Sequence, residues 1–171
     1  MKRNTENNFI QLMNTITDIR AIYIVIGNTL VRAGRIVFQL FLNIFIWKHT
    51  GGDLQVVALF NLVYLLFHTV SFLSVAFLVK AGYGKWLNLT ALLGYTLVYL
   101  MVIILGNNSL EYIYWIAAAI GVFNGMYWIT YHYHHFFVTN FANRGNYEGI
   151  KKSLAIITSV VVPPLVGTII A

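Results

Sequence analysis

The sequence predicts an all-α fold, a polytopic bundle of five transmembrane helices. The evidence is the composition, the length of five apolar stretches and the placement of the cations. The 171-residue chain is 59% hydrophobic and 9% charged, whereas soluble domains carry about 25% charged residues. A bilayer core about 30 Å thick needs about 20 helical residues, and lipid-exposed backbone must bond to itself, so each stretch should be helical. The stretches lie at about 21–47, 54–79, 86–105, 112–136 and 153–171.

The lysines and arginines outside the apolar stretches lie almost entirely on one side of them. They precede the first stretch or fall within the connections 80–85 and 138–152, and Lys48 alone lies on the opposite side. By the positive-inside rule, this distribution places the N-terminus in the cytoplasm of a multi-pass protein of the plasma (bacterial inner) membrane. The net charge of +6 is then a topology signal, and no basic-aromatic module indicates a nucleic-acid partner.

The short connections predict antiparallel neighbours and one domain, a transmembrane bundle over 21–171. Glycines punctuate the turns at 48–53, 80–85 and 106–111. Residues 1–20 are polar but carry apolar residues at helical spacing, and we expect a cytoplasmic amphipathic helix on the membrane surface. A short soluble helix packed on the loops is the alternative. The chain has no cysteine, which excludes disulfides and thiolate metal sites.

Two arginines lie deep within the first stretch. Arg32 and Arg35 are three residues apart, so they should share one helix face, roughly 18 to 22 Å from Trp47 at about 1.5 Å per residue. A cation at this depth normally faces protein or a water-filled cavity, which predicts a patch that attracts an anionic solute. The alternative is that both side chains snorkel to the cytoplasmic interface. The twelve residues from Ile36 to Trp47 are too few to cross, which favours a span that starts near Ala21.

Other polar and aromatic residues occur at mid-depth. His68 in the second stretch is a candidate for proton coupling, although a neutral imidazole bonded between helices is the simpler interpretation. Asn124, Trp128 and Tyr131 follow one face of the fourth stretch and predict a substrate-lining surface. An aromatic belt near the cytoplasmic headgroups would produce the same pattern.

Three further features of the last two stretches have structural alternatives. Gly121 and Gly125 have the spacing of close helix packing, which we take as their role. His132 and His135 could share a face, but no carboxylate or cysteine is near them in sequence, so we expect no metal site and no cofactor. Pro163-Pro164 should kink or break the fifth helix, and broken helices mark binding regions in many transporters.

Three local motifs resemble the N-terminal half of a major facilitator superfamily transporter. The connection after the second stretch carries Lys80, Gly82 and Lys85 in the pattern of that family's Asp-Arg-x-Gly-x-x-Lys loop, with Val79 in place of the aspartate. The connection after the fourth contains Arg144-Gly145-x-x-x-Gly149, similar to the family's second cytoplasmic loop. Pro164-x-x-Gly167 is similar to part of the family's Gly-Pro-x-x-Gly-Gly segment. The substitution at Val79 means that the family's charge-based gating cannot be carried over to this loop.

The resemblance implies alternating access, with the first, second, fourth and fifth stretches around a central cavity. Family members have two halves of six spans, so five spans ending at Ala171 imply a partial sequence whose partners are the bilayer, a small-molecule solute, and a missing C-terminal half or another bundle. We therefore expect a secondary transporter, or a fragment of one, for a solute that the sequence does not identify, with an anion suggested by the two arginines. The alternative is a non-transporting scaffold or accessory subunit. The sequence contains no soluble-enzyme motif, and we expect no enzyme activity.

Overall fold

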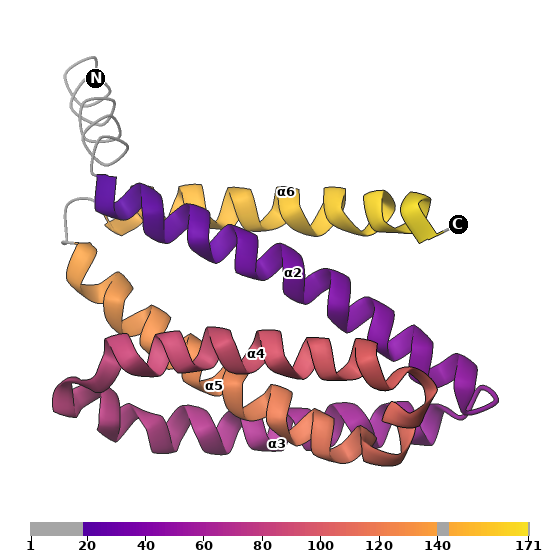
Figure 1. Ribbon diagram of the computed structural model, residues 1–171. Helices are drawn as coiled ribbons and strands as arrows, with labels where there is room; N and C mark the ends of the chain where they lie inside the picture. Colours follow the sequence, from indigo (N-terminus) through magenta and orange to yellow (C-terminus); the bar gives the residue numbers. More distant parts are fainter. Residues whose placement is uncertain (1–18, 140–143, 171) are drawn as a thin grey trace. The chain divides into compact units, whose positions relative to one another are not determined.

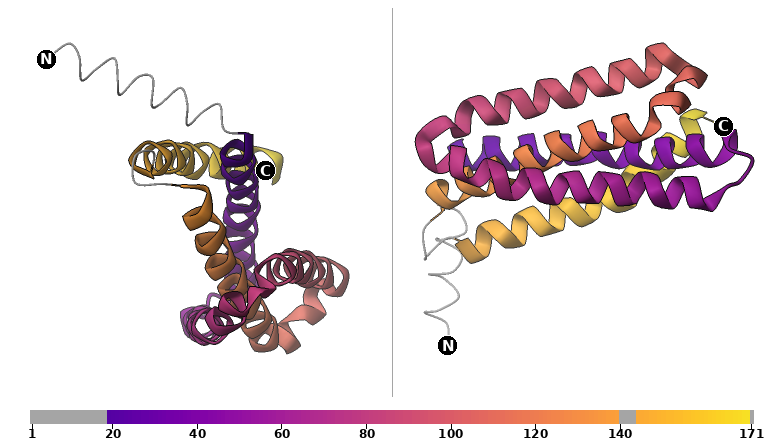
Figure 2. Two further views of the ribbon diagram at one scale, coloured as in Figure 1. Left: turned by 90° about the vertical axis from the view of Figure 1, so that its left-hand side faces the viewer. Right: turned by 90° about the horizontal axis from the view of Figure 1, so that it is seen from below.

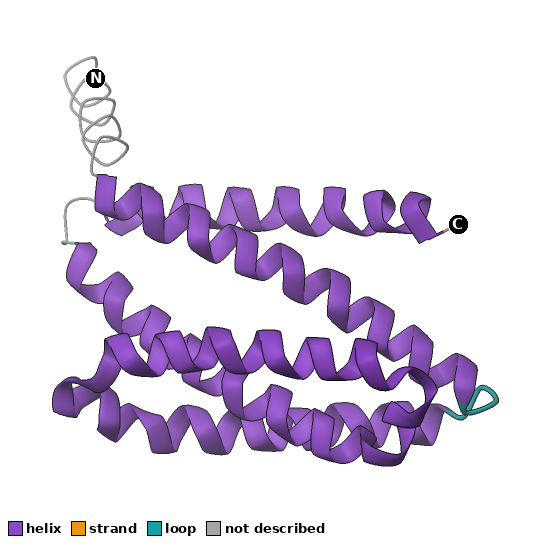
Figure 3. Cartoon of the chain, viewed as in Figure 1, coloured by secondary structure: helices purple, strands orange, loops and turns teal. Residues whose placement is uncertain are grey.

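The computed structural model describes residues 19–139 and 144–170, and every element in these ranges is helical (Figure 1 and Figure 3). No strand occurs in them. The predicted amphipathic segment 1–20 lies almost entirely outside the described residues. The elements in order are helix α2 (Ile19–His49), helix α3 (Leu54–Leu78), π-helical turn η1 (Val79–Tyr83), helix α4 (Gly84–Leu105), 3-10 segment η2 (Gly106–Tyr112), helix α5 (Ile113–Val138) and helix α6 (Arg144–Ile170).

The first four helices agree closely with the apolar stretches, but the fifth was predicted to begin too late. α6 starts at Arg144, whereas the hydrophobic pattern placed residues up to Lys152 in a loop. The physical reason is local pairing: the Lys151 ammonium lies 2.5 Å from a Glu148 carboxylate oxygen, one turn apart on α6. Such pairs stabilise a helix in water, where an apolar pattern gives no signal.

The double proline was expected to kink or break the fifth helix; the break was wrong, and the kink stays a prediction. α6 continues through Pro163 and Pro164 to Ile170. Proline fixes φ near the helical value, so it can continue a helix although it removes a backbone donor. Membrane helices tolerate this loss where neighbouring groups satisfy the carbonyls that are left.

The turns follow the glycines, as predicted. Gly82 within η1 has φ of 96° and Gly52 before α3 has φ of 87°. These are left-handed conformations that L side chains rarely adopt, and they let the chain reverse within a few residues. Asp53 then caps α3, because its Oδ1 accepts from the Gln55 backbone N–H at 2.8 Å.

The chain divides into two compact units, which we describe separately. The terminal unit comprises Met1–Phe41 and His135–Ala171, and the central unit is Leu42–His134. α2 and α5 each continue from one unit into the other.

In the central unit, α5 packs against both α3 and α4 (Figure 2). A Cβ atom added at Gly121 would lie 2.5 Å from the carbonyl oxygen of Tyr64, and one at Gly125 would lie 2.5 Å from that of His68. The two glycines therefore bring α5 into backbone contact with α3, which confirms their predicted packing role. On the other side of α5, the ring of Phe123 occupies the space where Gly94 of α4 lacks a side chain.

In the terminal unit, α2 packs against the first turns of α6. Tyr147 is 1% exposed and forms a buried core with Val25. Apolar side chains from three helices surround this pair: Ile24, Val138, Ile150 and Leu154.

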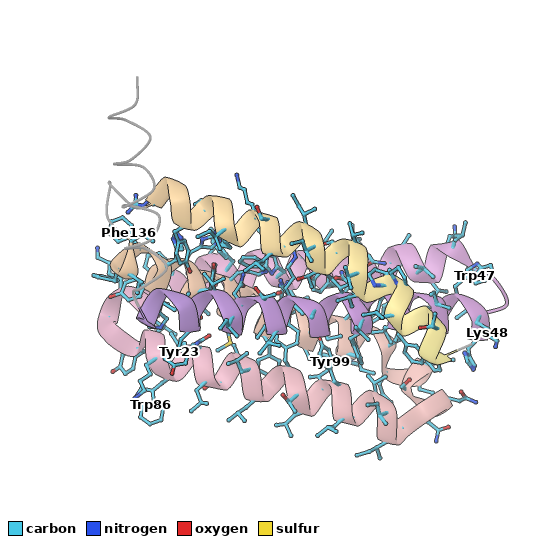
Figure 4. All side chains as sticks on the ribbon, turned by 90° about the horizontal axis from the view of Figure 1, so that it is seen from above. Tyr23, Trp47, Lys48, Trp86, Tyr99 and Phe136 are labelled. Carbon is cyan, nitrogen blue, oxygen red and sulfur yellow. The ribbon has the colours of Figure 1, made fainter. Side chains whose placement is uncertain are left out.

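Many large apolar side chains lie on the outside of both units. Two helical stretches, Tyr23–His49 and Leu54–Val138, are long and apolar enough to cross a membrane. Their most apolar windows are only 11% and 17% buried, although the central helix of a soluble protein would be mostly buried. Figure 4 shows apolar side chains projecting outward along α4, between labelled Trp86 and Tyr99.

Candidate functional site

Arg32 of α2 contacts α6 in the terminal unit. Its Nη2 donates to the Ser159 hydroxyl oxygen at 3.3 Å. The Ser159 hydroxyl in turn donates to the carbonyl oxygen of Ala155 at 2.8 Å. The guanidinium therefore reaches a polar group on the neighbouring helix at an exposed position. The choice between a protein-facing and a snorkelling arginine stays a prediction.

The charge on Arg32 is not balanced by any described carboxylate. Within residues 19–139 and 144–170, the ion pairs join Glu148 to His135 and Lys151, and none involves Arg32. Its Nε is buried and has no hydrogen-bond partner in the same part of the chain. A guanidinium carries five N–H donors, so donors remain for an anionic group.

The Arg32 contact lies beside the double proline. Pro163 comes four residues after Ser159 and therefore lies on the same face of α6, one turn further along. Neither proline has an N–H, so the carbonyls of Ser159 and Val160 lose the donors that a regular helix would supply. This segment of α6 thus combines main-chain acceptors with a cation from α2.

Arg35 extends the polar face of α2. Because α2 is helical throughout, Arg35 and the buried Asn28 lie within about one turn of Arg32, on neighbouring positions of one helix face. We call Asn28, Arg32 and Arg35, with Ser159 of α6, the arginine site.

Asn124 belongs to the central unit and is part of a helix contact. It is 2% exposed, and its amide donates to the hydroxyl of Tyr64 on α3. Asn124 lies between the two glycines that bring α5 against α3. This bond joins the two helices, which differs in character from the solute contact predicted from the sequence.

His68 lies on α3 in a ladder of rings. Its centroid is 6.1 Å from that of Tyr64 and 6.3 Å from that of Phe72. Its backbone N and O form part of the surface that Gly121 and Gly125 approach. Both ring contacts lie within α3, and the choice between proton coupling and a neutral imidazole bonded between helices stays a prediction.

Trp128 and Tyr131 form an aromatic group on α5. The two rings meet edge to face with centroids 5.7 Å apart, and Tyr131 also stacks on Tyr127 at 6.1 Å. Trp128 stacks on His132 at 5.5 Å. The predicted stripe is therefore a continuous run of ring contacts within the central unit, whereas Arg32 and Arg35 belong to the terminal unit.

His135 pairs with an acid that the sequence did not bring near it. Its Nε2 lies 3.1 Å from Glu148 Oε1, and its ring centroid is 4.5 Å from that of Tyr147. Arg144 adds a bond from Nε to Thr139 Oγ1 at 3.3 Å and lies over the Phe136 ring at 5.1 Å. These contacts fix the junction between α5 and α6.

The junction changes the acidity of Glu148. Burial by itself would raise the pKa of this carboxyl, but the hydrogen bond and charge of Lys151 oppose it, together with the charges of His135 and Lys152. The pKa is therefore held below its usual range. Glu148 contacts both the His135 ring and the Lys151 ammonium at the junction.

The residues of the two motif loops are placed differently from one another. Lys80 and Gly82 lie in η1 and Lys85 in the first turn of α4, so the first motif forms a turn as predicted. Arg144, Gly145 and Gly149 lie in the first turns of α6 and not in a loop.

Two polar partners were missed by sequence reasoning, Ser159 and Tyr64. Ser159 lies in an apolar stretch, and its only local signal is the proline four residues later. Tyr64 looks like any aromatic residue of an apolar helix, and no sequence pattern near it indicates a pairing with Asn124. Within the described part of the chain, no three His, Asp or Glu side chains group closely enough to hold a metal ion.

Comparisons with known proteins identify a distant relative, and that relative has no assigned activity. No family model matches the chain, and no solved structure matches it. The chain is 27% identical over 136 residues to a protein of Geobacillus stearothermophilus named "Uncharacterized protein in sodM 3'region". The match covers 77% of this chain and 61% of the relative. The chain therefore spans about three fifths of the relative's length.

Proposed function

We propose that the chain is a multi-pass protein of the plasma membrane that crosses the bilayer five times, with its N-terminus in the cytoplasm. The outward-facing apolar side chains support this proposal, because apolar surface of this extent is covered by lipid or a partner. α4 has 22 residues and is about 33 Å long at 1.5 Å per residue. That length matches a bilayer core of about 30 Å.

Aromatic residues at both ends of the central unit support the same proposal. Trp47 and Trp86 lie at opposite ends in Figure 4. Trp86 is 66% exposed and Trp115, near the start of α5, is 77% exposed. Exposed tryptophans gather at the two membrane–water interfaces, where the ring can contact both lipid and headgroups.

Within this frame, we propose that the chain is a solute transporter, or the N-terminal part of one, that binds an anionic group at the arginine site. The observation that carries the proposal is the Arg32–Ser159 hydrogen bond beside the double proline of α6. A cation without a described carboxylate partner is costly at membrane depth. An anionic solute that binds Arg32 would offset that cost.

The proposal places the protein with the major facilitator superfamily on motif resemblance. The tight turn at Gly82 between α3 and α4, with a lysine on each side, supports the likeness. Alternating access would then move α2 and α6 relative to the other helices around a bound solute.

A transport assay with matched variants tests the proposal. Purified chain is reconstituted in proteoliposomes and uptake of a panel of labelled monocarboxylates and phosphate is measured. We expect saturable uptake that falls at least tenfold in Arg32→Gln, while Gly34→Ala behaves as wild type, because a Cβ at Gly34 meets nothing within 4 Å. Equal uptake by wild type and Arg32→Gln would refute the anion site.

The second candidate function is a non-transporting membrane scaffold or accessory subunit. The observation that favours it is the use of Asn124 and Tyr64 in a packed helix contact. A scaffold needs no solute, so every member of the panel would fail to accumulate. In that case the outward apolar faces of the bundle would bind a partner helix.

A further inference from the structure

One tight turn at the end of the central unit carries two cations and two large rings. These four exposed side chains, which we call the turn patch, are Lys80 and Tyr83 in η1 and Lys85 and Trp86 in the first turn of α4. Gly84, between them, is buried, and a Cβ added there would lie 3.5 Å from the ring of Tyr133 on α5. The turn is therefore packed on the bundle, and the turn patch lies on its outer side.

The charge of the turn patch is not balanced within the central unit. Residues 42–134 are all described and contain two acids, Asp53 and Glu111. Both lie at the other end of the unit, where α2 meets α3 and α4 meets α5 (Figure 1). The 25 residues of α3 separate the two ends by about 37 Å, several times the Debye length of about 8 Å at physiological ionic strength. Within residues 19–139 and 144–170, no ion pair involves Lys80 or Lys85.

The position of the turn patch selects the kind of anion. The turn joins α3 and α4, whose outer faces are apolar, so in the proposed orientation it lies where these helices leave the lipid on the cytoplasmic side. A soluble anion would contact the lysines alone. A phospholipid presents a phosphate to the ammonium groups and, just below it, glycerol and acyl carbons to the rings of Tyr83 and Trp86, which favour this interface. Lysines close to a membrane helix attract anionic lipids.

We propose that the turn patch binds the headgroup of an anionic phospholipid of the cytoplasmic leaflet. The ammonium groups of Lys80 and Lys85 pair with the phosphate, and the rings of Tyr83 and Trp86 lie against the glycerol and the first acyl carbons. This inference rests on the proposed position of the chain in the bilayer and names the lipid class that covers this end of the central unit.

Quenching of Trp86 fluorescence by brominated lipids tests the inference. Bromine atoms on an acyl chain quench a tryptophan that lies beside that chain. The test chain carries Trp47→Phe, Trp115→Phe and Trp128→Phe, so that Trp86 alone remains of the four tryptophans. It is reconstituted in phosphatidylcholine with increasing fractions of dibrominated phosphatidylglycerol, or of dibrominated phosphatidylcholine as the reference.

We expect phosphatidylglycerol to bind beside Trp86 at least about fivefold more tightly than phosphatidylcholine, the effect of one lysine on an anionic lipid. In Lys80→Gln/Lys85→Gln this preference should fall toward one. Lys48→Gln is the matched control, because it makes the same change at an exposed lysine at the other end of the unit, and it should keep the preference. Circular dichroism checks that each chain is folded. Chains with all four tryptophans give a second measurement, in which the double variant should again lose more phosphatidylglycerol quenching than Lys48→Gln.

The outcomes separate this inference from the proposed membrane position. Equal quenching by the two lipids would overturn the inference and leave the chain in the bilayer. A preference that survives Lys80→Gln/Lys85→Gln, or that Lys48→Gln abolishes equally, would overturn the role of the turn patch. Displacement of the lipid by inorganic phosphate at constant ionic strength would make a soluble anion the occupant and overturn the inference. Absence of quenching by either lipid would overturn both the inference and the proposed position of the turn.

Discussion

The close contact between α5 and α3 predicts that a single methyl group at Gly125 destabilises the central unit. A Cβ there would lie 2.5 Å from the carbonyl oxygen of His68 and 2.8 Å from the backbone N of Phe72. Ordinary contacts are about 3.5 Å, so the two helices must separate by roughly 1 Å, which forfeits a quarter to a half of the dispersion energy at the contacts affected. Overpacking of this kind costs about 1–3 kcal/mol.

The measurement is the free energy of unfolding of Gly125→Ala in mixed micelles, followed by circular dichroism as sodium dodecyl sulfate is added. Gly34→Ala is the matched control, because it makes the same change on a helix where the new Cβ meets nothing within 4 Å. Alanine is the better helix former, so the control should be unchanged or slightly more stable. Equal stability of Gly125→Ala and Gly34→Ala would refute the packing of α5 against α3.

Two further predictions concern single contacts. Asn124→Ala and Tyr64→Phe should each lower the free energy of unfolding by about 0.6–1.7 kcal/mol. The double variant should lose less than the sum of the two, because both single changes remove the same hydrogen bond. Strictly additive losses in a double-mutant cycle would contradict this hydrogen bond. Glu148 has a lowered folded pKa, so the unfolded state takes up the proton first as pH falls below the ordinary value of about 4.3. Stability should therefore fall between about pH 5 and pH 3 in wild type and fall less in Glu148→Gln, and identical acid profiles in thermal melts would disprove this linkage.

The helices could be located from the sequence because apolar length and turn glycines are local signals. α2 to α5 begin and end close to the residues where the hydrophobic runs do, and Gly82 turns the chain where it was expected. The start of α6 was missed because its first turns are polar and are held by the Glu148–Lys151 pair. Hydropathy locates apolar runs, and it gives no signal for helical turns that are polar.

The site was predicted only in part, because side-chain pairing between distant residues leaves no local pattern. The position of Arg32 within an apolar run was evident, since a charge stands out there. Its partner Ser159 lies far away in sequence and is an unremarkable residue of the fifth stretch. Asn124 stood out for the same reason as Arg32, yet its amide bonds to Tyr64 across a helix contact, a role that polarity alone does not distinguish from solute binding.

The orientation of the bundle in the membrane is tested most directly by labelling single cysteines in intact cells. The native chain has no cysteine, so each variant reports one position. We predict that Thr50→Cys, before α3, and Asn107→Cys, in η2, react with an impermeant maleimide added outside. Ala81→Cys, in η1, should react only after the cells are permeabilised. Equal reaction of all three positions in intact cells would contradict a bundle that crosses the membrane with its N-terminus inside.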